Sequence, residues 1–148
     1  MSDKNLKLQQ MYTSAVHNQQ KGNYGVAENL YKNILKEIPN HINSQGNLGA
    51  LYTQMGKDQK ALELLRNVLK IEPNNINANS NLGIVYTHLI EYQKSIDHHK
   101  KVLEIEPNNA DAYNNLAINY KHLGESDLAK NYFYKAIEIN SKHANAYN

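Results

Sequence analysis

Apolar residues recur along the chain at the spacing of α-helices, in pairs of segments separated by a short polar break. Leu48, Leu51 and Met55 share one face of a predicted helix over residues 42–55, because residues three or four apart lie on the same side of a helix. A second helix is predicted over residues 59–71, where the apolar face is so broad that it must be covered on more than one side. The flanking sequence repeats this plan, so the chain is predicted to consist of helix pairs.

Prolines set the period of these pairs. Pro39, Pro73 and Pro107 stand 34 residues apart, and each is followed by an asparagine. Proline lacks a backbone N–H and clashes with the preceding helical turn, so a fixed proline period predicts a fixed helix-stop period. Ser141 stands where a fourth proline would be. A period of this length is typical of repeat proteins that stack helix pairs into a solenoid.

Small residues recur where two predicted helices must approach each other closely. In the first helices, one repeat position holds a small residue in three repeats: Gly49, Gly83 and Ala117. In the second helices, another position holds a small residue in all four repeats: Ala27, Ala61, Ser95 and Ala129. Side chains of this size let helices pack at the short end of the usual interaxial distance of about 8–10 Å. The pattern therefore indicates packing rather than chemistry.

These positions resemble the tetratricopeptide repeat (TPR) family, whose unit carries Leu-Gly, Tyr, Ala, an aromatic residue and Pro in that order. The second repeat supplies the fullest match, with Leu48-Gly49, Tyr52, Ala61, Leu65 and Pro73. The resemblance implies an all-α fold, a right-handed α-solenoid of about four helix–turn–helix units. We expect one array over residues 1–148, with repeats at about 8–41, 42–75, 76–109 and 110–143. Residues 144–148 are expected to begin a truncated fifth helix or cap, as in a piece of a longer protein.

The third repeat departs most from the family pattern. Ser95 and His99 replace a small apolar residue and an aromatic one, and the surrounding second helix is the most polar of the array. We predict that this helix has the lowest local opening free energy. At the end of the array, Leu128, Tyr132 and Ile139 are expected to be partly uncovered.

Composition and charge narrow the function classes. The net charge is only +2 and both signs are interspersed, which argues against a nucleic-acid surface. The chain has no cysteine and no apolar run long enough to cross a membrane, and its N-terminus lacks a secretory signal. We therefore expect a cytoplasmic protein that binds neither nucleic acid nor membrane.

The resemblance implies that the first helices line a concave face. Candidate peptide-binding residues are the side chains on that face that do not pack against neighbouring helices: Asn43, Asn47, Asn77, Asn81, His88, Asp111, Asn115 and His122. Asn47, Asn81 and Asn115 are repeat equivalents, and an amide can pair with both the N–H and the C=O of a peptide backbone. This row is similar to the asparagine ladder of O-linked N-acetylglucosamine transferases. It is equally explained as repeat consensus. The cationic clamp of chaperone-binding TPR domains has no counterpart here, so docking of heat-shock chaperones is not expected.

No motif in the sequence indicates catalysis, a cofactor or a metal site. His98 and His99 are adjacent, so they point about 100° apart on a helix and cannot chelate one ion together. His88 and His122 are repeat equivalents that could make binding depend on pH.

The predicted function is a protein–protein interaction module that binds an extended peptide or helix in a concave groove. The partner is a protein or peptide of unknown identity. Two alternatives stay open, which are the substrate-recruiting arm of a larger, glycosyltransferase-like enzyme and a scaffold that self-associates through uncapped terminal helices. The array itself is not expected to be an enzyme.

Overall fold

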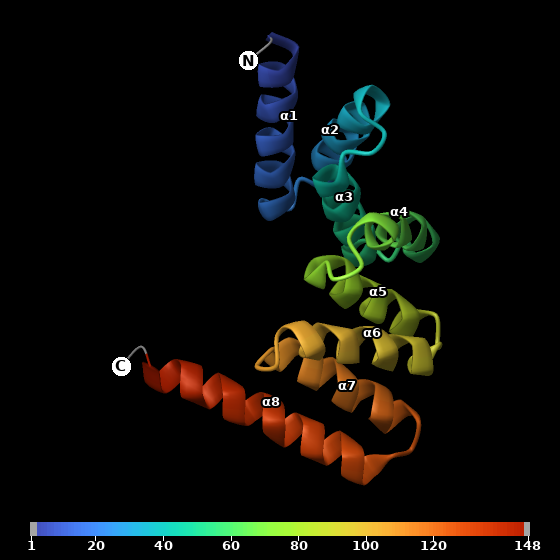
Figure 1. The fold of residues 1–148 in the computed structure, drawn as a ribbon, viewed down its shortest axis with the longest axis vertical. Helices are drawn as coiled ribbons and strands as arrows, with labels where there is room; N and C mark the ends of the chain where they lie inside the picture. The colour runs from blue at the N-terminus through green and yellow to red at the C-terminus, as the bar shows by residue number, and fades with distance from the viewer. Residues whose placement is uncertain (1–2, 147–148) are drawn as a thin grey trace. The chain divides into compact units, whose positions relative to one another are not determined.

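The computed structural model describes the backbone of residues 3–146 and the side chains of residues 3–142. Within that part of the chain every regular element is an α-helix, so the predicted all-α fold class is confirmed (Figure 1). The helices, in chain order, are α1 (Asp3–Gln20), α2 (Tyr24–Glu37), α3 (Ile42–Gln54), α4 (Asp58–Ile71), α5 (Ile76–His88), α6 (Tyr92–Ile105), α7 (Ala110–His122) and α8 (Ser126–Ala146).

The helices form two compact units, Met1–Ile71 and Glu72–Asn148. In the first unit α1 packs against α2, α2 against α3, and α3 against α4. In the second unit α5 packs against α6, α6 against α7, and α7 against α8, while α5 also touches α7. Successive helices are therefore neighbours in each unit, as helix–turn–helix repeats require. The grouping of all four repeats into a single array remains a prediction.

The prolines end the second helix of each of the first three repeats. α2, α4 and α6 each stop two residues before a proline, at Glu37, Ile71 and Ile105. The fourth repeat has Ser141 at this place, and α8 continues through it to Ala146. Residues 144–146 thus extend α8 instead of starting a new helix, because no proline interrupts the chain there. Residues 147 and 148 lie outside the described residues.

One side chain caps the start of each first helix that follows a proline. His41 Nδ1, Asn75 Oδ1 and Asn109 Oδ1 each accept a hydrogen bond from the backbone N–H three residues later. This bond satisfies one of the N–H groups that a helix start leaves without an intrahelical partner. The first unit uses an imidazole for this role, whereas the second unit uses amides.

The turn between the two helices of each repeat needs a residue in the left-handed region. Gly22, Gly56 and Gly124 fill this position with φ of 78°, 66° and 81°, and Ile90 fills it in the third repeat with φ of 63°. Glycine adopts this conformation without strain, whereas a β-branched side chain collides with its own backbone. Ile90 is also 72% exposed, so packing does not offset the strain.

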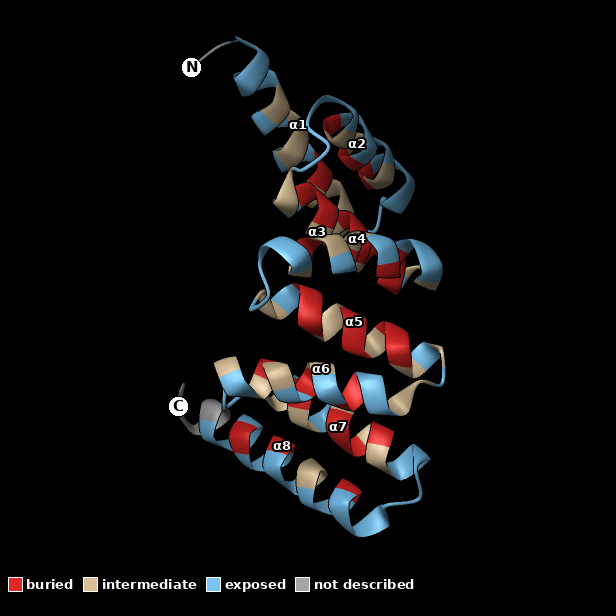
Figure 2. Cartoon of the chain, turned by 45° about the vertical axis from the view of Figure 1, so that its right-hand side comes forward, coloured by how far each residue is buried: buried red, intermediate tan, exposed pale blue. Residues whose placement is uncertain are grey.

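The predicted close approaches of helices are present in the core. A Cβ on Gly49 would lie 2.7 Å from Leu65, and one on Gly83 would lie 2.4 Å from the Nε2 atom of His99. Ala117, the equivalent residue of the fourth repeat, is fully buried. Figure 2 shows the buried residues in stripes along the helices, as expected for amphipathic helices.

The polar departures in the third repeat are buried. Ser95 and Asn119 are both fully buried, and Asn119 Nδ2 donates to Ser95 Oγ at 2.8 Å. Thr87 Oγ1 in turn lies 3.0 Å from Asn119 Oδ1, which ties α5, α6 and α7 together. His99 is only 1% exposed, and neither of its ring nitrogens has a hydrogen-bond partner.

The end of the second unit differs in part from the sequence-based expectation. Leu128 is 42% exposed and Tyr132 is half-buried, as predicted. Ile139, however, is 5% exposed, so the prediction that it is uncovered was wrong. Ile139 follows Tyr132 and Ala136 on the side of α8 that packs against α7, which explains its burial.

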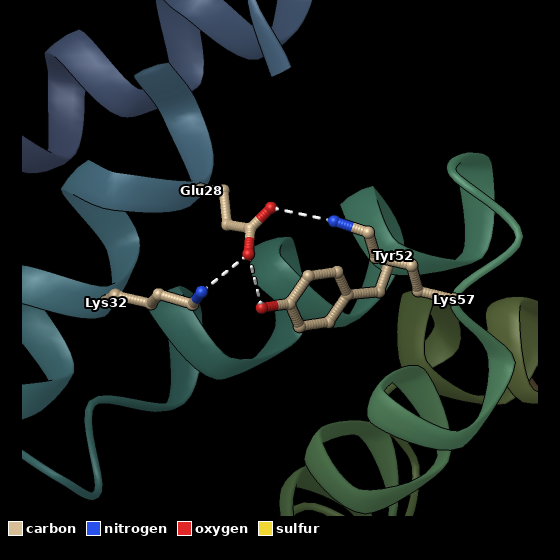
Figure 3. A network of polar contacts seen from close by, with 4 residues as sticks. All are labelled: Glu28, Lys32, Tyr52 and Lys57. Atoms are coloured by element: carbon tan, nitrogen blue, oxygen red, sulfur yellow. Dashed lines mark hydrogen bonds and ion pairs between the residues drawn. The ribbon is translucent and has the colours of Figure 1, made fainter. Parts of the chain in front are cut away.

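A carboxylate joins the helices of the first unit (Figure 3). Glu28 on α2 accepts hydrogen bonds from Lys32 at 2.6 Å, from Lys57 at 3.0 Å and from the Tyr52 hydroxyl at 3.0 Å. The hydrogen bond from Lys32 contributes most to lowering the pKa of Glu28 to about 2. Lys57 and Tyr52 lower it further, and partial desolvation of the carboxylate opposes them. The ion pair therefore connects the first repeat to the second.

Candidate functional site

The first unit presents two of the predicted peptide-binding residues on α3. Asn43 is exposed near the start of the helix, whereas Asn47 is half-buried. The Asn47 Nδ2 atom donates to the Tyr12 hydroxyl of α1 at 3.0 Å. The Asn47 amide is therefore partly committed to holding Tyr12, which the sequence-based prediction of an asparagine row had not foreseen.

The second unit presents the equivalent residues on α5 and α7, which are in contact. Asn77 and Asp111 are exposed, and Asn81 and Asn115 are half-buried. Asn81 Nδ2 donates to the backbone carbonyl of Asn77 at 2.8 Å. Within the described residues, the side-chain amides of Asn77 and Asn115 have no hydrogen-bond partner. These polar groups are placed to bind a polar ligand or solvent.

The two predicted histidines stand at the last residues of α5 and α7, and both are exposed. The His122 ring stacks on Tyr92 of α6, with the centroids 4.8 Å apart and the planes 1° from parallel. His122 thus also has a packing role. Among the described residues, no group of three metal-ligating side chains comes together.

A pocket of about 380 Å³ opens in the first unit between α1, the end of α2 and the start of α3. It is lined by Asn5, Leu8, Gln9, Tyr12, Ile34, Ile38, His41 and Asn43. Of the candidate peptide-binding residues only Asn43 belongs to it. No aspartate, glutamate, lysine or arginine belongs to this lining.

Tyr12 is the best-fixed side chain of this pocket. Its ring meets the rings of Tyr31 and His41 edge to face, with centroids 6.2 Å and 5.6 Å apart. Its hydroxyl is held by Asn47. The ring is therefore preorganised, and a ligand that packs against it need not order it first.

The turn that aligns with residues 38–43 has a different chemistry in the second unit. It borders a pocket of about 530 Å³ that opens towards α8, not α5, and is lined by Glu106, Pro107, Asn108, Asn109, Ala110, Asp111 and Asn140. Glu106, Asn109 and Asp111 are the repeat equivalents of Ile38, His41 and Asn43. The turn of the first unit thus presents an apolar side chain and no carboxylate, whereas the equivalent turn of the second unit presents two carboxylates.

Sequence reasoning missed the roles of Tyr12, Ile38 and His41. The signal was available, because each of them breaks the repeat pattern. Tyr12 aligns with Gly46, Ser80 and Asn114, while Ile38 aligns with Glu72 and Glu106, and His41 with Asn75 and Asn109. The sequence alone does not show that these three departures lie around one pocket.

None of the helices in residues 3–146 combines the length and the apolarity that a membrane span requires.

The comparisons with known proteins agree on one architecture. The structure is similar to MamA from Desulfovibrio magneticus RS-1, with a TM-score of 0.84 and 21% identity, over 91% of this chain and 76% of that one. It is also similar to MamA MSR-1, with a TM-score of 0.80 and 23% identity, over 97% of this chain and 82% of that one. For MamA AMB-1 the TM-score is 0.80 at 25% identity, over 89% and 78% of the two chains. These likenesses confirm the predicted all-α solenoid class.

Comparison with curated protein sequences gives no match. Two family models do match. A tetratricopeptide repeat model matches residues 75–142, and a second TPR repeat model matches residues 49–89. Together they cover well over half of the 148 residues and include the repeats that carry Gly49, Gly83 and Ala117. The chain therefore belongs to the tetratricopeptide repeat family.

Proposed function

We propose that the chain is a protein–protein interaction module that holds an extended segment of a partner protein on its first helices. Membership of the tetratricopeptide repeat family and the structural likeness to MamA support an interaction role without catalysis. The part of the proposal that specifies an extended segment on the first helices rests on the side-chain amides of α5 and α7.

The observation that carries the proposal is the state of Asn77, Asn81 and Asn115. Within the described residues, Asn77 and Asn115 have side-chain amides without a hydrogen-bond partner, and Asn81 uses one N–H on a backbone carbonyl. Asn81 and Asn115 are half-buried, and a partly desolvated amide gains from a partner that both donates and accepts. An extended peptide backbone offers both a donor N–H and an acceptor C=O. Contacts of this kind do not distinguish one peptide side chain from another.

Selection from a random-peptide library against the intact chain tests this proposal. Peptides that bind are then added to the protein, and amide hydrogen exchange is followed along the chain. The proposal expects slower exchange on the first helices, α5 and α7 above all, and little change on the exposed sides of α4 and α8. Failure to select any peptide, or protection confined to second helices, would contradict it.

Self-association is a second candidate, and α8 provides the observation that favours it. Tyr134 and Ile137 on this helix are 69% and 60% exposed, and Leu128 adds a third apolar side chain. In Figure 2 most of α8 is coloured as exposed. Sedimentation velocity over a concentration series tests this candidate, and a single monomer at every concentration would exclude it.

A further inference from the structure

The first-unit pocket combines three features that bear on what it binds. Its lining contains no aspartate, glutamate, lysine or arginine, it contains a preorganised aromatic ring, and the amides of Gln9 and Asn43 lie in the same lining. Amides of this kind suit a peptide backbone, and the ring of Tyr12 with Leu8 and Ile38 suits an apolar side chain.

We propose that this pocket binds one uncharged, apolar side chain of an extended partner segment, such as leucine or phenylalanine, against Tyr12 and Ile38. The inference rests on the proposed function and names the side chain that the module selects. The side chain that occupies the pocket belongs to another protein, and the pocket recognises it because it is uncharged and apolar.

Charge around the pocket supports this choice of occupant. Lys4 and Glu37 form an ion pair at the surface, with their atoms 2.9 Å apart, and they line an adjoining pocket that shares only Leu8 with this one and also contains Lys7 and Lys36. A charged side chain that entered the pocket would lose water and would gain no counter-ion among the lining side chains, which is costly. An apolar side chain pays no such penalty and gains from removal of its surface from water.

The equivalent turn of the second unit shows that the apolar side chain of Ile38 is not required by the fold. Glu106 in that turn occupies the position of Ile38, and Asn109 occupies that of His41. Both residues are compatible with the same turn and the same helix start. Ile38 is 38% exposed at the end of α2, so its apolar side chain is not needed to fill the core.

The same comparison provides the substitution for a test. Ile38→Glu gives the pocket the residue that the second and third repeats carry, Glu72 and Glu106, so the backbone tolerates it. Ile71→Glu is the matched control, because Ile71 is 52% exposed at the end of α4 and lies outside the pocket. Circular dichroism and thermal unfolding check that both variants remain folded.

The experiment selects peptides from one random library against the intact wild type, the Ile38→Glu variant and the Ile71→Glu variant. For the wild type and Ile71→Glu, the selected peptides should share one position occupied by leucine, isoleucine, methionine or phenylalanine. For Ile38→Glu this position should lose its apolar preference and gain lysine or arginine. Amide chemical shifts of Tyr12, His41 and Asn43 should move when a wild-type peptide is added.

A second variant measures the contribution of the ring. Tyr12→Ser introduces the residue found at the equivalent Ser80, and it should weaken a wild-type-selected peptide by about tenfold. Two outcomes would overturn the inference and leave the proposed function standing. One is that peptides selected by the wild type share no apolar position, and the other is that the wild type and the Ile38→Glu variant select the same sequences. Absence of any selected peptide would overturn both.

Discussion

His99 holds the position at which the second repeat has Leu65, and each side chain packs onto a glycine of the preceding helix. The imidazole is buried with both nitrogens unpartnered, which costs stability that leucine would not cost. Burial also lowers the pKa of His99 to about 4, and the charge of His98 adds to this effect.

We predict that His99→Leu raises the free energy of unfolding at neutral pH by about 1–2 kcal/mol. The substitution should also change the pH dependence. The unfolded state binds a proton at His99 below about pH 6.5 and the folded state only near pH 4, so the wild type loses stability as the pH falls through this window. Urea unfolding at several pH values measures both effects. An unchanged pH slope in the variant would contradict the prediction.

Ile90 is the strained residue of the third repeat. Its φ of 63° is the conformation for which the other repeats use glycine. We predict that Ile90→Gly raises the free energy of unfolding by about 1 kcal/mol, because the left-handed conformation costs a non-glycine residue about this much.

The reverse substitution, Gly56→Ile, is the matched control for Ile90. A Cβ on Gly56 would meet nothing within 4 Å, so the cost of the substitution should come from the backbone alone. Thermal unfolding should show opposite shifts for the two variants. Shifts of the same sign would show that φ does not decide the effect.

Glu28 is a residue whose effect extends from α2 to α3 and to the turn before α4. Glu28→Gln should lower the free energy of unfolding by about 1–2 kcal/mol, because hydrogen bonds to a charged group are stronger than those to a neutral one. The pKa of Glu28 is lowered from 4.5 to about 2, so its contribution is present above pH 4.5 and is lost as the pH falls towards 2. Chemical denaturation at pH 7 measures the loss. Glu138→Gln, which affects only ion pairs within α8, should leave stability unchanged.

At the scale of elements, the helix pair α5–α6 combines two defects. Its turn contains the strained Ile90, and its core contains the unpaired His99. The buried bonds among Thr87, Ser95 and Asn119 offset part of this cost. The structure thus supplies physical reasons for the sequence-based prediction that α6 has the lowest opening free energy.

Native-state hydrogen exchange tests that prediction. Backbone amides of α6 should exchange faster than the equivalent amides of α4, because the local opening free energy is lower. In the combined Ile90→Gly and His99→Leu variant the exchange in α6 should slow towards the rate in α4. Slower exchange in α6 than in α4 of the wild type would show that the prediction is wrong.

The elements were largely predictable from sequence because the same signals recur from repeat to repeat. Proline stops and turn glycines each occur in three repeats and asparagine caps in two, so the helix starts and stops follow from local backbone chemistry. The end of α8 was less predictable, since Ser141 removes the stop signal without adding another. The burial of Ile139 depends on its contact with α7, which local sequence does not specify.

At the scale of the whole molecule, the family and the fold class followed from the repeat, but the pocket did not. The pocket exists because three departures from the repeat, Tyr12, Ile38 and His41, lie on three different helices or their ends. Only the arrangement of these three residues in space shows that they line one pocket. The asparagine row was predictable as a pattern, whereas the bond that links Asn47 to Tyr12 was not.

The central claim is that half-buried side-chain amides of the first helices, those of Asn81 and Asn115, hold the backbone of a partner segment. The most direct measurement is the affinity of one library-selected peptide for the intact chain and for the Asn81→Ala/Asn115→Ala variant, by fluorescence anisotropy. We predict that the Asn81→Ala/Asn115→Ala variant binds the peptide more weakly than the wild type, by about tenfold or by a larger factor. The control variant Asn29→Ala/Asn131→Ala, which lacks two exposed amides of second helices, should bind it as the wild type does. Equal affinity of the wild type and the Asn81→Ala/Asn115→Ala variant would contradict the claim.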